Sequence, residues 1–182
     1  MALAFIGSLA VPLEAQHVGI ARVGDAVAVQ APGLGFIKGE MLSRLKDGRA
    51  VRVDFDLTAL PGPGGAAVTR GQRTFVLSYD LWEERFAVTM AGEPPRSVSY
   101  LTANAAEAWC LEHVTIPLAT LGRLRDAPFW IRLEYRILDS EPAPASDEGA
   151  GLTLRSLIEL FSKRPRAGAV THAVEAGPFR VR

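Results

Sequence analysis

Apolar and polar residues alternate with a period of two along several stretches of this chain. In the segment 51–58 the odd positions are apolar and the even positions are polar. The same alternation recurs at 75–79, 86–90 and 131–137. This period is typical of a β-strand that has one face on a core and the other in water, as in an antiparallel sheet. These stretches therefore predict strands.

Two further strand patterns, at 18–23 and 26–30, flank Gly24-Asp25, a pair that is typical of a hairpin turn. Weaker strands are predicted at 97–101, 113–117 and 179–182. With about eight strands in all, the chain is predicted to be mainly β and to form an antiparallel β-sandwich.

Two or three short helices are expected beside the strands. Apolar residues recur at helical spacing over 37–45, and Gly48 follows where a helix-ending glycine belongs. Residues 104–107, Asn-Ala-Ala-Glu, resemble a capping box that opens a second helix. A third apolar stripe covers 153–164 and stops before a proline.

The 182 residues are predicted to form one domain, since domains span roughly 100–200 residues. Residues 17–139 are expected to form the β-sandwich core. The segment 140–151, rich in Pro, Ala, Ser and acidic residues, is predicted to be a flexible loop. Residues 152–182 are predicted to add a C-terminal helix and a terminal strand to the same domain.

Residues 1–16 begin with an apolar run from Ala2 to Leu13. This run is too short for a membrane span, which needs about 20 residues. Its length suits a secretory signal, and cleavage after Ala10 or Ala15 would follow a small residue, although no basic residue precedes the run. The segment is therefore predicted to be a truncated signal peptide, which implies a periplasmic or extracellular protein, or an N-terminal strand of a cytoplasmic one.

Charge and composition exclude several classes of protein. The chain has 20 basic and 20 acidic residues and a pI of about 6.8. A nucleic-acid-binding protein needs a net basic face, so no nucleic-acid partner is predicted. A hydrophobic content of 48% excludes a disordered chain. A single cysteine, Cys110, excludes a disulfide framework and a cysteine-rich zinc site.

Cys110 and His113 lie three residues apart on the second predicted helix and therefore share a face. A pair of this kind could form an activated thiolate nucleophile. However, Cys110 lies between Trp109 and Leu111, and free cysteine is among the most buried residue types. A structural role is therefore favoured.

Asp54 and Asp56 point the same way from one predicted strand, next to Arg52. Paired carboxylates could bind calcium or act as acid and base. The regular alternation around them favours a solvated strand face instead.

Other motifs carry no recognisable chemistry. The loop 61–65 is rich in glycine but lacks the Gly-Lys-Ser/Thr ending of a phosphate-binding loop. The histidines His17, His113 and His172 show no metal-ligand spacing. We therefore predict no catalytic, cofactor-binding or metal-binding residues.

Arg132, Glu134 and Arg136 form a charged stripe on one predicted strand, and Trp130 shares their face. Mixed charge is common on exposed sheet faces, so cross-strand pairing with the acidic face of the strand 51–58 is favoured for the stripe. An exposed tryptophan is costly, so a helix or a partner is expected to cover Trp130. Trp130, Arg132 and Arg136 are the predicted interaction surface.

The third predicted helix is followed by Lys163, Arg164 and Arg166. An amphipathic helix beside basic residues can lie on an anionic membrane. Packing of its apolar stripe on the sandwich is favoured over membrane docking.

Residues 74–88, Thr-Phe-Val-Leu-Ser-Tyr-Asp-Leu-Trp-Glu-Glu-Arg-Phe-Ala-Val, resemble the central hairpin of an uncharacterised bacterial family of exported proteins. The resemblance rests on Leu-Ser-Tyr-Asp, a charged turn and an aromatic returning strand, and it extends over 36–138. It implies export, a β-sandwich and no known activity, and it assigns no catalytic residues.

Together these patterns favour a non-catalytic interaction module of the bacterial cell envelope that binds a protein or envelope component without a cofactor. One alternative is an enzyme or small-ligand binder with an apolar pocket between the sheets and Asp54, Asp56 or His113 at its mouth. Another is a peripheral membrane protein that docks through 154–166.

Overall fold

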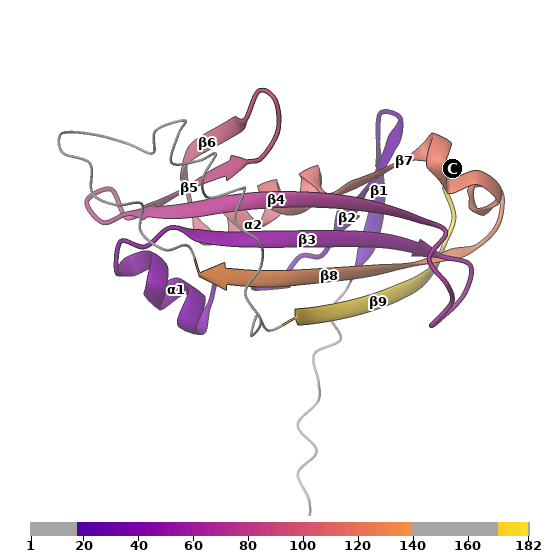
Figure 1. The fold of residues 1–182 in the computed structure, drawn as a ribbon, viewed down its shortest axis with the longest axis horizontal. Coiled ribbons are helices and arrows are strands. Elements are labelled where there is room, and N and C mark those ends of the chain that lie inside the picture. Colours follow the sequence, from indigo (N-terminus) through magenta and orange to yellow (C-terminus); the bar gives the residue numbers. More distant parts are fainter. Residues whose placement is uncertain (1–17, 140–170, 182) are drawn as a thin grey trace, which may run out of the picture.

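The protein is described by a computed structural model, which covers residues 18–139 and 171–181. Its larger sheet is antiparallel and has six strands in the order β6-β5-β4-β3-β8-β9 (Figure 1). These strands are β3 (Val51–Leu60), β4 (Thr69–Asp80), β5 (Arg85–Met90), β6 (Arg96–Leu101), β8 (Phe129–Asp139) and β9 (Thr171–Phe179). Because β3 pairs with both β4 and β8 along its whole length, it forms the centre of the sheet.

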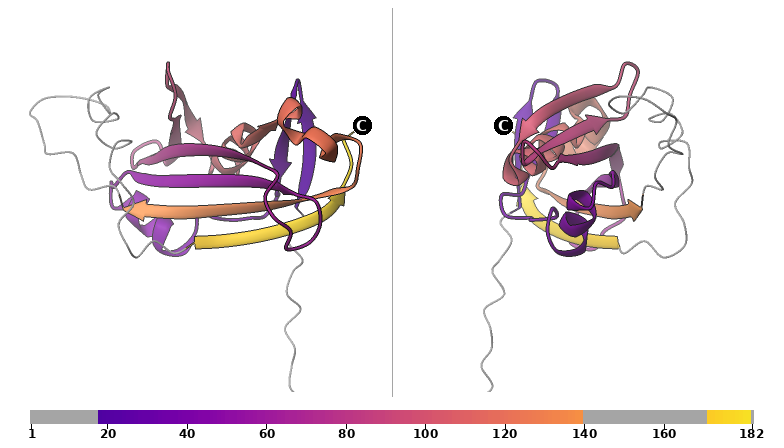
Figure 2. Two further views of the ribbon diagram at one scale, coloured as in Figure 1. Left: turned by 45° about the vertical axis from the view of Figure 1, so that its right-hand side comes forward. Right: turned by 90° about the vertical axis from the view of Figure 1, so that its left-hand side faces the viewer.

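The smaller sheet has three antiparallel strands in the order β1-β2-β7. Its strands and the helices of the described chain are β1 (Gly19–Val23), β2 (Ala26–Gln30), β7 (Thr115–Pro117), α1 (Gly39–Lys46), α2 (Ala103–His113) and the 3-10 helix η1 (Leu118–Arg125). Figure 2 shows that β1 and β2 cross the long strands of the larger sheet at a steep angle.

The smaller sheet, α1 and α2 pack on one face of the six-stranded sheet, which we call the inner face. The ring of Phe75 in β4 meets Trp109 of α2 edge to face, with 5.9 Å between the ring centroids. Gly71 of β4 lies so close to β7 that a Cβ atom there would overlap the carbonyl oxygen of Thr115. The two sheets are therefore in backbone contact at Gly71, where no side chain fits between them.

Apolar residues at alternate strand positions fill the space above the inner face. Phe55, at the centre of β3, contacts Phe36, Phe75 and Tyr135 with centroid distances of 5.3, 5.8 and 5.7 Å. Aromatic pairs in such edge-on and tilted arrangements contribute about 0.5–1.5 kcal/mol beyond the area they bury. This aromatic cluster is the middle of the core.

The prediction of a mainly β, antiparallel, two-sheet fold with short helices is confirmed. The predicted hairpin turn at Gly24-Asp25 lies between β1 and β2. The strand patterns at 51–58, 86–90 and 97–101 correspond to β3, β5 and β6. The calls for residues 1–16, 140–151 and 153–164 lie outside the described residues.

Two local predictions are wrong. The last strand is Thr171–Phe179, not 179–182, because its pairing with β8 starts at Thr171 and ends at Phe179. Helix α2 begins after Thr102, whose hydroxyl accepts a hydrogen bond from the amide of Ala105 at 3.3 Å. Thr102 is therefore the N-cap, and Asn104 lies within the first turn.

The even positions of β3 point to the opposite, outer face of the six-stranded sheet. Asp56 and Thr58 on this face are only 9% and 6% exposed. The prediction of a solvated strand face is therefore wrong at the centre of the sheet. Polar groups tolerate this burial because they are hydrogen-bonded to their neighbours, as described next.

Candidate interaction surface

Asp54 is held on the outer face by two neighbours. The Nε and Nη2 atoms of Arg52 donate to its two carboxylate oxygens at 2.9 and 3.1 Å. The hydroxyl of Thr74, its partner across β4, donates at 2.7 Å. The charge of Asp54 is therefore balanced within the sheet.

Asp56 is engaged in a similar way. The side-chain amide of Gln72 donates to Asp56 Oδ2 at 3.0 Å, and the hydroxyl of Thr58 donates to Oδ1 at 3.3 Å. The Nε atom of Arg70 forms an ion pair with Oδ1 at 3.2 Å. Asp56 therefore joins two strands, and it lies on the face that points away from the space between the sheets.

Trp130, Arg132 and Arg136 lie at even positions of β8, on the outer face. The indole ring of Trp130 packs on Gly177 of β9, where a Cβ atom would lie 2.6 Å from the ring. We expected a helix or a partner over Trp130, and among the described residues the bare backbone of Gly177 takes that place. In the strand register Arg136 lies opposite Asp54, whereas Glu134 lies opposite Asp56, so the predicted pairing of opposite charges fits the register at one of the two aspartates.

Arg132 is bound to Glu175 of the neighbouring strand. Its Nη2 and Nε atoms donate to Glu175 Oε2 at 2.8 and 3.1 Å. The other carboxylate oxygen accepts the backbone N–H of Gly64 at 2.8 Å. The Gly64 bond, together with Arg132, lowers the pKa of the Glu175 carboxyl. Glu175 thus fastens the loop after β3 to the sheet edge, and Arg132 holds the Glu175 carboxylate in place.

The Cys110–His113 pair has a structural role, as favoured from the sequence. Cys110 is fully buried, and burial, with a contribution from Glu107, raises the pKa of its thiol well above the usual range. The Nδ1 atom of His113 donates to the carbonyl of Trp109 at 2.8 Å, and the two rings pack at a tilt of 34° with 4.2 Å between their centroids. Reactive cysteines are partly exposed and have a lowered pKa, whereas Cys110 is buried and its pKa is raised.

Glu107 is a buried carboxylate that we missed as a separate feature. Its Oε1 accepts the backbone N–H of Ile37 at 2.6 Å, which fixes the segment before α1 to α2. The predicted capping box over 104–107 would have directed the Glu107 side chain to the N-terminus of its own helix. Burial, and then the charge of Glu107, also raise the pKa of the Tyr135 hydroxyl.

The turn between β4 and β5 displays two apolar side chains to solvent. Asp80 Oδ1 accepts the backbone N–H groups of Trp82 and Glu83 at 2.8 and 3.0 Å. Leu81 is 58% exposed and Trp82 is 96% exposed. Because the turn is fixed by Asp80, Trp82 is held out from the molecule by an ordered backbone.

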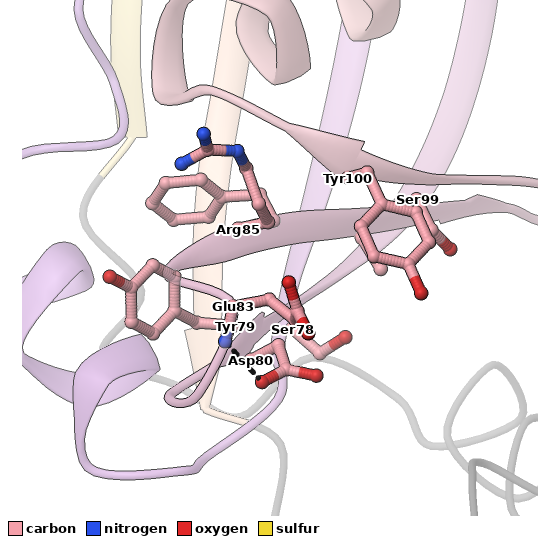
Figure 3. Close-up of a pocket in the computed structure, with 9 residues that line it drawn as sticks. Ser78, Tyr79, Asp80, Glu83, Arg85, Ser99 and Tyr100 are labelled. Carbon is pink, nitrogen blue, oxygen red and sulfur yellow. Dashed lines mark hydrogen bonds between the residues drawn. The ribbon is translucent and has the colours of Figure 1, made fainter.

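A hollow of about 290 Å³ lies beside this turn, between β4, β5 and β6 (Figure 3). It is lined by Ser78, Tyr79, Asp80, Glu83, Arg85, Phe86, Ala87, Ser99 and Tyr100. In Figure 3 the side chains of Ser78, Asp80 and Glu83 lie across from Tyr100, and the Arg85 guanidinium points away. The lining therefore combines hydroxyls, two carboxylates, the Arg85 side chain and three aromatic residues, of which Tyr100 is the most exposed.

Tyr100 adopts its position over the hollow through a bulge in β6. Phe86 pairs with Leu101 and Val88 with Val98, so Ser99 and Tyr100 together face a single residue of β5. Tyr100 has a φ of 62° and is 74% exposed. A positive φ is an outlier for a bulky residue and costs about 1–3 kcal/mol. We call Leu81, Trp82 and the residues that line the hollow the hairpin-end surface.

The described part of the chain contains no group of His, Cys, Asp and Glu that could hold a metal ion. Of the three histidines named in the sequence analysis, His172 stacks on Tyr135 with 4.8 Å between the ring centroids. His17 lies outside the described residues. Within 18–139 and 171–181 no helix has the length and apolar character needed to cross a membrane.

Comparison of the chain with known protein family models, curated proteins and solved structures found no match to any of them. The resemblance of residues 74–88 to a family of exported proteins stays a prediction. Any function therefore has to be inferred from the chemistry of this chain itself.

Proposed function

We propose that the protein is a non-catalytic interaction module of the bacterial cell envelope that binds a partner protein through the hairpin-end surface. The observation that carries this proposal is the 96% exposure of Trp82 on a turn fixed by Asp80. Tryptophan is the residue type most enriched among binding hot spots. An ordered turn also reduces the conformational entropy lost on binding.

The potentially reactive groups of the described chain support a non-catalytic role. The Asp54 and Asp56 carboxylates are bound to arginines and hydroxyls of the sheet. Cys110 is buried with a raised pKa, and His113 donates to a backbone carbonyl. Each of these groups holds the structure together.

The enzymatic alternative placed Asp54, Asp56 or His113 at the mouth of a pocket between the sheets. His113 packs on Trp109 and donates to its carbonyl. Both carboxylates point to the outer face, whereas Phe55 between them points to the smaller sheet. Neither carboxylate can therefore line such a pocket. The membrane alternative depends on 154–166, which lie outside the described residues.

Site-specific photo-crosslinking tests the proposed surface. The photoreactive amino acid p-benzoylphenylalanine would replace Trp82, and in matched chains Val68 or Trp130, in cells that express the natural gene. Val68 is a suitable control because it is 49% exposed and precedes β4, at the opposite end of that strand. We expect a discrete protein adduct from position 82 and none from position 68.

Two outcomes would overturn the surface assignment. One is an identical set of adducts from positions 68 and 82, which would show that contacts at Trp82 are nonspecific. The other is a discrete adduct from position 130 alone, which would move the interaction to the β8 stripe of Trp130, Arg132 and Arg136.

The envelope location rests on the apolar run within residues 1–16 and needs its own test. Fractionation of cells with mass spectrometry of the mature N-terminus should find a chain outside the cytoplasm that begins near Val11 or Gln16. An intact Met1 on a cytosolic chain would contradict export, while the crosslinking result would still decide the interaction surface.

A further inference from the structure

The hairpin-end surface is acidic as well as aromatic. The carboxylates of Asp80 and Glu83 and the hydroxyl of Ser78 face the ring of Tyr100 across the hollow (Figure 3). Arg85 also contributes to the lining, but its guanidinium points away from these carboxylates, and its Nη1 donates to the carbonyl of Glu84 at 3.1 Å (Figure 3). The hollow therefore combines negative charge with an exposed aromatic face.

Its size fits one side chain of a partner better than a whole small molecule. Sites for small molecules enclose about 300–1,000 Å³ and bury most of their ligand. This hollow of about 290 Å³ is at the lower end and open to solvent. A long side chain from a neighbouring protein could enter it while its backbone passed over the turn.

We infer that the partner presents a lysine or arginine beside an apolar residue, and this inference rests on the proposed function. The cationic group enters the hollow between Tyr100 and Glu83, and the apolar residue packs on Leu81 and Trp82. Ammonium and guanidinium groups are attracted to the face of a tyrosine ring and to carboxylates.

The same charges exclude other occupants. Phosphate groups of nucleic acids or anionic lipids would meet Asp80 and Glu83, and like charges brought together oppose association. An acidic peptide would meet the same repulsion. A basic segment of a protein is thus the partner with complementary charge.

Nuclear magnetic resonance titration of the isotope-labelled full chain with defined peptides tests this inference. The probe is a short glycine–serine peptide with one leucine next to one lysine. In the matched peptides the lysine becomes glutamine or glutamate. We expect the lysine peptide to shift the resonances of Ser99, Tyr100 and the Trp82 indole, and to bind more tightly than the glutamine peptide by about two- to fivefold.

Variants of the hollow separate charge from packing. Glu83→Gln should abolish the preference for lysine, and Glu83→Lys should reverse it in favour of the glutamate peptide. Tyr100→Phe should retain lysine binding, whereas Tyr100→Leu should weaken it by about twofold or more, because leucine has no π face. Glu112→Gln removes an exposed carboxylate of α2 and should change nothing.

The outcomes distinguish this inference from the proposed function. Equal binding of all three peptides at Trp82 would overturn the charge preference and leave the docking surface intact. Resonance shifts confined to residues outside the hairpin-end surface, together with no adduct from position 82, would overturn both. An unchanged lysine preference in Glu83→Lys would also contradict the inference.

Discussion

The centre of the six-stranded sheet and its hairpin end contain the same kinds of residues in opposite states. At the centre, the carboxylates of Asp54 and Asp56 are bound by arginine and hydroxyl neighbours, and Phe55 is buried among other rings. At the hairpin end, Trp82 and Tyr100 are 96% and 74% exposed. Residue type alone therefore does not distinguish structural from functional groups.

The two regions differ in how much each side chain contributes to the stability of the fold. An aromatic residue at an inward strand position removes apolar area from water and so stabilises the fold. Trp82 lies in a turn and Tyr100 in a bulge, where the fold gains little from either side chain. Apolar residues at such positions are the ones to examine for binding.

The largest effect is expected at Gly71, where the two sheets are in backbone contact. Gly71→Ala would force its methyl group against the Thr115 carbonyl, so β4 and β7 must separate. We expect the free energy of unfolding to fall by about 3 kcal/mol or more, measured by urea denaturation. Gly92→Ala is the control, since a Cβ there meets nothing nearer than 3.6 Å. A loss of stability no greater in Gly71→Ala than in this control would contradict the tight sheet packing.

The second effect compares a bound carboxylate with an exposed one. Asp56→Ala leaves the buried hydroxyl of Thr58 without its acceptor and removes the partner of the exposed Gln72 and Arg70 side chains. We expect unfolding to become easier by about 1–3 kcal/mol, because groups that lose a buried hydrogen bond remain desolvated. Glu83→Ala at the hairpin end should stay within about 0.5 kcal/mol of wild type. An equal loss of unfolding free energy in the two variants would contradict the proposed difference between the sheet centre and the hairpin end.

The strands were predictable because their periodicity records burial directly. The alternation over 51–58 and 131–137 specified which residues face the core, and Cys110 was correctly expected to be buried. That alternation could not show that Asp56 on the other face is also buried, since burial there depends on neighbours from β4 that are distant in sequence.

The hairpin-end surface was not predictable as a site. Residues 74–88 predicted a hairpin, but the bulge that turns Tyr100 over the hollow arises from how β6 pairs with β5. No short-range pattern specifies that register. The signal present in the sequence was Leu81-Trp82 itself, two apolar residues in a turn where polar ones are usual.

A smaller, pH-dependent effect is expected at Glu175, on the rim of the outer face. Its folded-state pKa is lowered by Gly64 and Arg132, so the ionised carboxylate stabilises the fold above its unfolded pKa. That stabilisation is lost as the pH falls through the folded pKa. Glu175→Gln should therefore unfold more easily than wild type at neutral pH, and by less than Asp56→Ala. The two stabilities should converge as the pH is lowered through the acid range. A difference independent of pH would show that the charge of Glu175 contributes nothing.

The smallest effect on stability is expected at Trp82, and it sharpens the comparison most. Trp82→Ala removes a side chain that is 96% exposed, so the free energy of unfolding should change by no more than about 0.5 kcal/mol. Trp130→Ala is the matched variant, because its indole ring packs on Gly177, and it should lose about 1–3 kcal/mol. Urea denaturation of both variants measures the difference. If Trp82→Ala is as destabilised as Trp130→Ala, Trp82 supports the fold and its exposure no longer argues for a partner. If it is unchanged, the fold does not depend on this tryptophan, and binding is the remaining role to test.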